Sequence, residues 1–232
     1  MPGRSPTLLL LRDELVGFAR SKVMLVLWIL MPLVAIAGYL LLPSMLNVRG
    51  ASSSMLSATM FMSLIMSSLA GTIASIMVAV DIVTERNRKV YELFAIRPIR
   101  REAIIWSKFL AVLACVAIAC VASIAFGIAL DAIRGRAPDA AALHDAAKSL
   151  AALVGVLAMS TAGGVLIGVL ARSILVAVIL VLYVGQNLTV LPLLPSYFGV
   201  LPQLFWVIIL LSFALSVAVV YGAGVVFRRA EL

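Results

Sequence analysis

Six long apolar runs constrain this chain more than any other feature. The hydrocarbon core of a bilayer is about 30 Å thick, and a helix needs roughly 20 apolar residues to cross it. In this chain 64% of the 232 residues are hydrophobic and only 12% are charged. We therefore expect an all-α integral membrane protein with six transmembrane helices, at approximately Val23–Leu42, Met55–Val80, Ile104–Leu130, Leu150–Leu170, Ile174–Leu194 and Leu204–Phe227.

The basic residues indicate how these helices are oriented. Lys and Arg accumulate in the cytoplasmic loops of membrane proteins. With a cytoplasmic N-terminus, fourteen of the eighteen basic residues fall on the inner side. We therefore predict that both termini and the Asp81–Lys108 loop are cytoplasmic. The basic residues flank apolar runs instead of forming one soluble face, so the net charge of +8 does not indicate a nucleic-acid partner.

No internal repeat or low-complexity linker divides the chain, so we predict a single membrane domain over residues 1–232. Before the first span, apolar residues recur at heptad spacing from Leu8 to Phe18. This spacing predicts an amphipathic helix that lies along the cytoplasmic interface. The predicted order is this helix within 1–22, spans one and two within 23–80, a cytoplasmic coupling loop over 81–103, and spans three to six within 104–232.

The interiors of the predicted spans contain no Asp, Glu or His. Ion-coupled transporters and intramembrane proteases depend on such groups, whose burial costs about 2.5–3.5 kcal/mol each on insertion scales. Asp81 and Lys108 lie at span ends, and His144, the one histidine, falls in a predicted external loop. The sequence also lacks a glycine-rich phosphate-binding loop. We predict no catalytic residue and no metal ligand, and expect another polypeptide to supply the energy for any transport.

Uncharged polar residues within the spans are the candidates for a translocation pathway. In the second span, Ser63, Ser67 and Thr72 accompany flexible methionines, and they either pack helices together or line a pathway. In the fifth span, Gln186 and Asn187 carry amides that must find polar partners away from water. We expect this pair to face a translocation cavity or a subunit interface.

Two pairs of small residues indicate how the helices pack. Gly164 and Gly168 are spaced for a close contact between helices. Cys115 and Cys120 are the only cysteines, and at 3.6 residues per turn they point about 140° apart on one helix. They therefore cannot form a disulfide with each other, and we expect both to be small buried hydrophobic residues.

The loop after the second span combines charge with an apolar stripe. Glu85–Lys108 holds seven basic residues, and within Val90–Phe94 apolar residues recur at helical spacing. We expect Thr84 to begin a short helix and Pro98 to end it. Anchoring to anionic lipid explains the basic residues, but it does not explain the acids or a stripe that one short helix cannot bury. A docking surface for a soluble partner explains both.

These features resemble the permease subunits of type-2 ABC exporters. Such permeases have an amphipathic helix before six spans. Their loop between spans two and three contains a Glu, a short helix ending in Leu-Leu, a turn with Pro, and Gly-Lys opening span three. The chain departs from this pattern in having Arg88-Lys89-Val90 where Gly-Thr is usual, and Ser107 where Gly is common. The corresponding residues are Glu85, Glu92-Leu93-Phe94, Arg97-Pro98-Ile99-Arg100 and Ser107-Lys108.

The resemblance implies a plasma (inner) membrane exporter that works as a pair of permease subunits, identical or homologous. Each loop helix would seat on a separate ATP-binding cassette ATPase subunit. ATP and Mg would bind that partner, so this chain would hold no cofactor and would not be an enzyme. ATP-driven closure would move substrate outward by alternating between two states. The implied coupling residues are Glu85, Glu92, Leu93, Phe94, Arg97, Pro98, Arg100 and Arg101.

Two other functions remain to be weighed. A membrane scaffold could recruit a soluble partner through the same loop without transporting anything. The amides of the fifth span and the apolar, proline-bearing segment Leu191–Gln203 favour transport over a scaffold. A passive channel is disfavoured because the chain lacks a charged ring or a selectivity loop. The Met- and Ser-rich second span suits amphipathic or lipid-like cargo better than free ions.

Overall fold

Helices form all the regular structure in the part of the chain that the structure describes. The computed structural model describes residues 6–46, 58–88, 101–133, 140–185, 187 and 202–229. No strand occurs in these ranges, which confirms the all-α class. The helices are α1 (Pro6–Ala19), α2 (Lys22–Leu46), α3 (Ala58–Asn87), α5 (Arg101–Ile133), α6 (Ala140–Leu170), α7 (Ile174–Leu180), the π-helix η1 (Val181–Gly185) and α10 (Pro202–Arg229).

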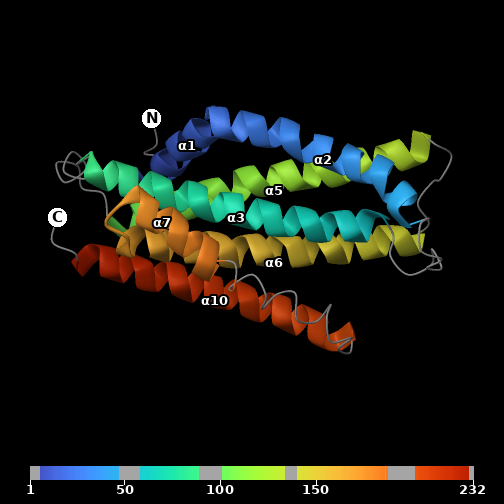
Figure 1. Ribbon diagram of the computed structural model, residues 1–232. Helices are drawn as coiled ribbons and strands as arrows, with labels where there is room; N and C mark the ends of the chain where they lie inside the picture. Colours follow the sequence, from blue (N-terminus) through green and yellow to red (C-terminus); the bar gives the residue numbers. More distant parts are fainter. Residues whose placement is uncertain are drawn as a thin grey trace, which may run out of the picture.

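The long helices lie side by side in an elongated bundle (Figure 1). α6 packs against both α3 and α10, and α1 and α2 pack against α5. At one end of the bundle α1 and α5 begin and α3, α6 and α10 end (Figure 1). These are the helix ends that flank the segments predicted to be cytoplasmic. Their common location agrees with an arrangement that puts those segments on one side of a membrane.

Three helices are long and apolar enough to cross a membrane, judged by length and composition over the described residues. A fourth span results if two helical pieces joined at a sharp bend, Leu8–Ala19 and Lys22–Val34, are counted together. The predicted number of six spans therefore stays a prediction. The three candidate spans are Glu102–Phe126, Ala147–Leu170 and Phe205–Arg229.

Several helices extend beyond the apolar runs that predicted them. α3 continues past Val80 to Asn87, so the expectation that Thr84 begins a new helix is wrong. The Thr84 hydroxyl instead donates to the carbonyl of Val80, 2.6 Å away, within the same helix. α6 begins at Ala140, so His144 lies on a helix and not in a loop, with an exposed side chain. Hydropathy marks the part of a helix that suits a bilayer, whereas the helix itself can continue into polar sequence.

α1 and α2 meet at a bend of 62°. Ser21 marks the junction, because its hydroxyl accepts a hydrogen bond from the backbone N–H of Met24 at 3.1 Å, as a helix N-cap does. Leu8 is exposed, Leu11 and Leu15 are half-buried and Phe18 is buried, so the predicted apolar stripe of α1 becomes more covered toward its C-terminal end. The helix predicted within residues 1–22 is present. Its place at a membrane interface stays a prediction.

α3 and α6 approach each other closely where α6 carries glycine. A Cβ at Gly164 would lie 2.5 Å from the carbonyl oxygen of Ser75, and one at Gly168 would lie 3.0 Å from Cα of Ala79. Distances this short leave no room for any side chain. The predicted close contact at the two glycines is therefore confirmed, and α3 is the partner helix.

α5 holds both cysteines in the interior of the bundle. Cys115 and Cys120 are free and buried, which confirms that they behave as small hydrophobic residues. The indole N–H of Trp28 on α2 donates to the carbonyl of Cys115, with 3.4 Å between nitrogen and oxygen. This contact joins α2 to the middle of α5.

Candidate functional site

Lys108 is the largest fully buried side chain among the described residues. Its ammonium nitrogen lies 2.5 Å from Oδ2 of Asp81, 2.8 Å from Oε1 of Glu85 and 3.1 Å from Oε1 of Glu14. The lysine side chain is 0% exposed, whereas the three carboxylates are 18–31% exposed. We call these four residues the Lys108 cluster. It is a buried cation enclosed by acids that reach it from the surface.

Three helices bring the Lys108 cluster together. Asp81 and Glu85 are four residues apart on α3, so they lie on one face of that helix. Lys108 is in the second turn of α5, and Glu14 comes from α1. All three helix segments belong to the end of the bundle where α3 ends and α5 begins (Figure 1). The cluster therefore ties the two helices that flank the predicted coupling loop to each other and to α1.

The donors and acceptors in the cluster match in number. A lysine ammonium has three N–H donors. Each of the three carboxylates contributes one oxygen to it. A buried charge is tolerated only when it is paired and hydrogen-bonded, and removing one partner of a buried pair costs about 3–5 kcal/mol. Lys108 thus meets the condition for burial, because it donates hydrogen bonds to Asp81 and Glu85 and forms a third ion pair with Glu14.

The surroundings of Lys108 also include an aromatic ring and an unpaired carboxylate oxygen. The ring centre of Phe18 lies 6.0 Å from the Lys108 nitrogen, within the range of a cation–π contact. Oε2 of Glu85 is buried and has no hydrogen-bond partner among the described residues. Glu85 is also the cluster member that the sequence predicts to be a coupling residue. The cluster therefore contains one buried acceptor, Oε2 of Glu85, that the described helices leave unpaired.

Arg86 provides a second connection at the same end of the bundle. Its Nη1 donates to the carbonyl of Val169 at 2.9 Å, and its Nη2 donates to the carbonyl of Ala171. The last carbonyls of an α-helix lack partners within the helix and carry partial negative charge. Arg86 therefore caps the C-terminus of α6 from α3, and fixes α6 to the same helix end that holds Lys108.

Most of the predicted coupling residues fall outside the described ranges. Glu85 lies in the Lys108 cluster on α3. Arg101 is the first residue of α5, and its side chain is not described. The remaining coupling residues, which lie outside the described ranges, are Glu92, Leu93, Phe94, Arg97, Pro98 and Arg100.

The predicted pathway residues are described only in part. Thr72 is half-buried on α3. Asn187 is exposed, and its amide donates to the carbonyl of Tyr183 at 2.8 Å, just after the π-helix Val181–Gly185. The side chains of Ser63 and Ser67, and all of Gln186, lie outside the described part. The assignment of a translocation pathway to these residues stays a prediction.

The sequence interpretation missed the Lys108 cluster because it treated the charged residues as span ends. Lys108 lies inside the candidate span Glu102–Phe126 and is fully buried. One signal was available in the sequence: Asp81 and Glu85 have the i, i+4 spacing that puts two acids on one helix face, where they repel each other unless a cation lies beside them. The identity of that cation required the fold, since Glu14 and Lys108 are distant in sequence.

Comparison with known protein families supports the resemblance to ABC permeases that the sequence indicates. The model of a family described as "ABC-2 family transporter protein" matches residues 8–198, which is most of the chain. No curated protein matches the chain. The matched range runs from α1 through the Lys108 cluster and α7. The chain therefore belongs to the ABC-2 family of transporter proteins, as a membrane-embedded permease of the type-2 ABC class.

Proposed function

We propose that this permease is the transmembrane subunit of an ABC exporter, which moves substrate outward by alternating access. A separate ATP-binding cassette subunit would hydrolyse ATP and bind the segment between α3 and α5. A second permease subunit, identical or homologous, would complete the transport unit in the plasma membrane. Family membership supports the transport role. The observation that carries the mechanism is the Lys108 cluster.

The cluster is positioned to transmit movement of the segment between α3 and α5. α3 ends at Asn87 and α5 begins at Arg101, so a partner bound to the intervening residues acts on both helix ends. Lys108 joins those two ends to each other through Asp81 and Glu85, and to α1 through Glu14. Arg86 extends the connection to α6. Force on the segment is therefore expected to move four helix ends as one unit, and not to separate α3 from α5.

The proposed route of the substrate runs along the surface of the bundle. We place it beside α3 and α7, where Thr72 and Asn187 lie, along the interface between two permease subunits. The exposed apolar side chains on α7 and η1 favour this placement, because they need either lipid or a second subunit to cover them. They include Leu175, Ile179, Leu182 and Tyr183.

Reconstitution with the ATPase partner tests directly whether the permease transports a substrate. The chain is purified from its native membrane together with any bound ATPase, and both are placed in proteoliposomes. Transport requires ATP-dependent movement of a co-purified ligand and stimulation of ATP hydrolysis by the permease. A scaffold would bind the ATPase but give no ATP-dependent movement. Labelling of single cysteines placed in residues 89–100 from either side of sealed vesicles tests the predicted cytoplasmic orientation.

Two substitutions test coupling. Phe94→Asp puts a charge in the predicted docking stripe, and we expect normal membrane insertion with loss of ATPase stimulation. Glu85→Gln keeps the shape of the side chain but removes one charge from the cluster, and we expect transport per ATP hydrolysed to fall. Arg228→Gln breaks the exposed contact of Arg228 with Glu102, 3.3 Å long, and serves as the control with unchanged coupling. Full coupling in Glu85→Gln would contradict the role of the cluster.

A further inference from the structure

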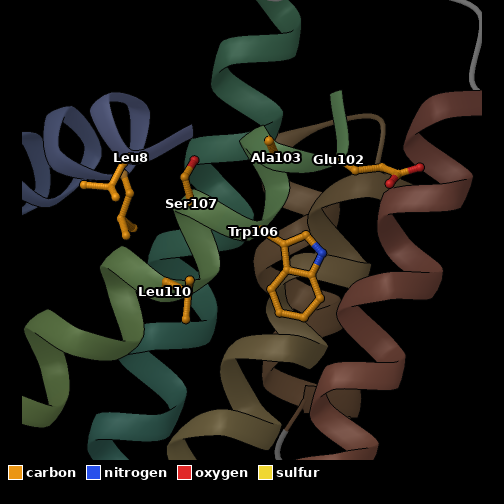
Figure 2. A pocket seen from close by; sticks show the side chains of 7 residues that line it. Leu8, Glu102, Ala103, Trp106, Ser107 and Leu110 are labelled. Atoms are coloured by element: carbon orange, nitrogen blue, oxygen red, sulfur yellow. The ribbon is translucent and has the colours of Figure 1, made fainter. Parts of the chain in front are cut away.

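A groove opens on the surface of α5 near its N-terminus. Its volume is about 370 Å³, at the lower end of the 300–1,000 Å³ range of ligand sites. Leu8 and Leu11 of α1 form one side, and α5 forms the floor (Figure 2). α10 lies beyond the far side of α5 in the same view (Figure 2). The lining from α5 consists of Glu102, Ala103, Trp106, Ser107 and Leu110.

The groove lies at the level where a membrane meets water. Glu102 is the first residue of the candidate span Glu102–Phe126, so the groove covers the first turns of that span. Trp is enriched at this level in membrane proteins, because its ring is apolar and its N–H is polar. Leu8 and Leu110 remain exposed along the groove. An apolar channel at this depth can receive the acyl chain of a lipid while the headgroup stays in the polar layer.

Charges of both signs stand at one end of the groove. Glu102 points toward α10 (Figure 2), where Nη1 of Arg228 lies 3.3 Å from its carboxylate. Their side chains are 32% and 62% exposed, so both charges remain accessible to a ligand. Arg229, also exposed, follows in the chain. A purely anionic headgroup would be repelled by Glu102, and a purely cationic one by Arg228. A zwitterionic headgroup satisfies both.

We propose that this groove binds a phospholipid with a zwitterionic, amine-bearing headgroup. The ammonium group of the lipid pairs with Glu102, and its phosphate pairs with Arg228. One acyl chain lies over Trp106 and Leu110, beside Leu8. A water molecule occupies about 30 Å³ of liquid, so the groove holds about a dozen groups of that size, enough for a substantial part of one chain. This site depends only on membrane insertion, and holds whether or not the chain exports a substrate.

Quenching of Trp106 by brominated lipid tests the proposal on the full chain. Trp28→Phe and Trp206→Phe leave Trp106 as the only tryptophan of the three in the chain, and excitation at the red edge of the indole absorption avoids the tyrosines. The purified protein in detergent is titrated with phosphatidylethanolamine that carries bromine on its acyl chains, which quenches indole fluorescence on contact. We expect saturable quenching at a low lipid fraction. Lipid that merely surrounds the protein would instead quench in proportion to its concentration.

A matched pair of substitutions on α5 locates the binding. Ala103→Phe fills the groove, and we expect it to weaken lipid binding by about tenfold or more, a change of about 1.4 kcal/mol. Ala122→Phe makes the same change at an exposed position of α5 outside the groove and should leave binding unchanged. If Ala103→Phe does not fold, Glu102→Gln provides a surface substitution that leaves the packing intact.

Comparison of lipids with different headgroups tests whether the groove prefers a zwitterionic headgroup. Brominated phosphatidylcholine should bind about as well as phosphatidylethanolamine, while phosphatidylglycerol and diacylglycerol should bind about tenfold more weakly. Glu102→Gln should abolish the preference for the amine-bearing lipids over phosphatidylglycerol. Equal binding of all four lipids, or full binding in Ala103→Phe, would overturn the proposal. Absence of quenching by every lipid would also overturn it.

Discussion

α6 and α10 pass the same test for a membrane span, yet they lie in different surroundings. In the apolar segment of Ala147–Leu170, 83% is buried within the chain, against 22% for Phe205–Arg229. α6 meets α3 through glycine, as the contacts at Gly164 and Gly168 show. α10 exposes large apolar side chains such as Leu210. Hydropathy is alike in the two helices, so residue size, and not hydropathy, separates the helix surrounded by protein from the helix that faces lipid or a partner.

The largest difference in stability is expected between two ion-paired cations, Lys108, which is buried on α5, and Arg228, which is exposed on α10. Lys108→Met leaves three carboxylates without their cation, and removal of one partner of a buried pair costs about 3–5 kcal/mol. Arg228→Met on α10 breaks an exposed pair, which is worth about 0–1 kcal/mol. Thermal unfolding in detergent measures both. Equal losses would contradict the assignment of Lys108 as the buried centre of the cluster.

The chain contains its own reporter for such measurements. Cys115 and Cys120 are free and buried, and they are the only cysteines in the sequence. A thiol-reactive fluorescent dye therefore labels the protein only as the bundle opens. All variants in this series keep both cysteines, so one assay compares them directly. Rapid labelling of the unheated protein would show that α5 is not buried as described.

The second, smaller difference in stability is expected between glycine substitutions on α6 and on α10. A Cβ at Gly164 of α6 would lie 2.5 Å from the Ser75 carbonyl, whereas one at Gly222 of α10 would meet nothing within 4 Å. Gly164→Ala forces the helices apart, and overpacking of this kind costs about 1–3 kcal/mol. Gly222→Ala should be neutral or stabilise by up to about 1 kcal/mol, because Ala favours helix over Gly. A neutral Gly164→Ala would show that α3 and α6 are farther apart.

The smallest effect is expected on the outer face of α10. Leu210 is 69% exposed, and a substitution on an exposed surface changes stability by about 0.5 kcal/mol or less. Leu210→Ala should therefore leave the unfolding temperature unchanged. Leu157→Ala on α6 is the matched interior control, since Leu157 is fully buried and its truncation costs about 2–5 kcal/mol. A marked loss in Leu210→Ala would indicate that a second subunit covers α10.

The apolar pattern predicted most of the helices but not where they end. α5 and α10 contain the runs Ile104–Leu130 and Leu204–Phe227 and extend a few residues beyond each. α3 and α6 extend further, to Asn87 and from Ala140, because a helix can continue through polar residues outside a bilayer. The glycine contact was predictable because small residues at this spacing allow two helices to approach closely. Its partner helix was not predictable from the sequence.

The functional centre was harder to foresee than the fold. Glu85 was chosen as a coupling residue from its place in a family pattern, whereas its partners Glu14, Asp81 and Lys108 were not chosen as a group. Pairing between helices depends on which faces meet, and an isolated sequence does not contain that information. Arg86 was counted only as one of many basic residues. Its contacts with the carbonyls at the end of α6 depend on the α3–α6 approach, which the glycines permit.

The order of the Lys108 cluster along the chain has a consequence for synthesis. Glu14, Asp81 and Glu85 all leave the ribosome before the cation that they share. Protein segments assemble from the N-terminus onward during translation. During synthesis, Glu14, Asp81 and Glu85 therefore lack the cation that they share in the folded protein until Lys108 itself has been made.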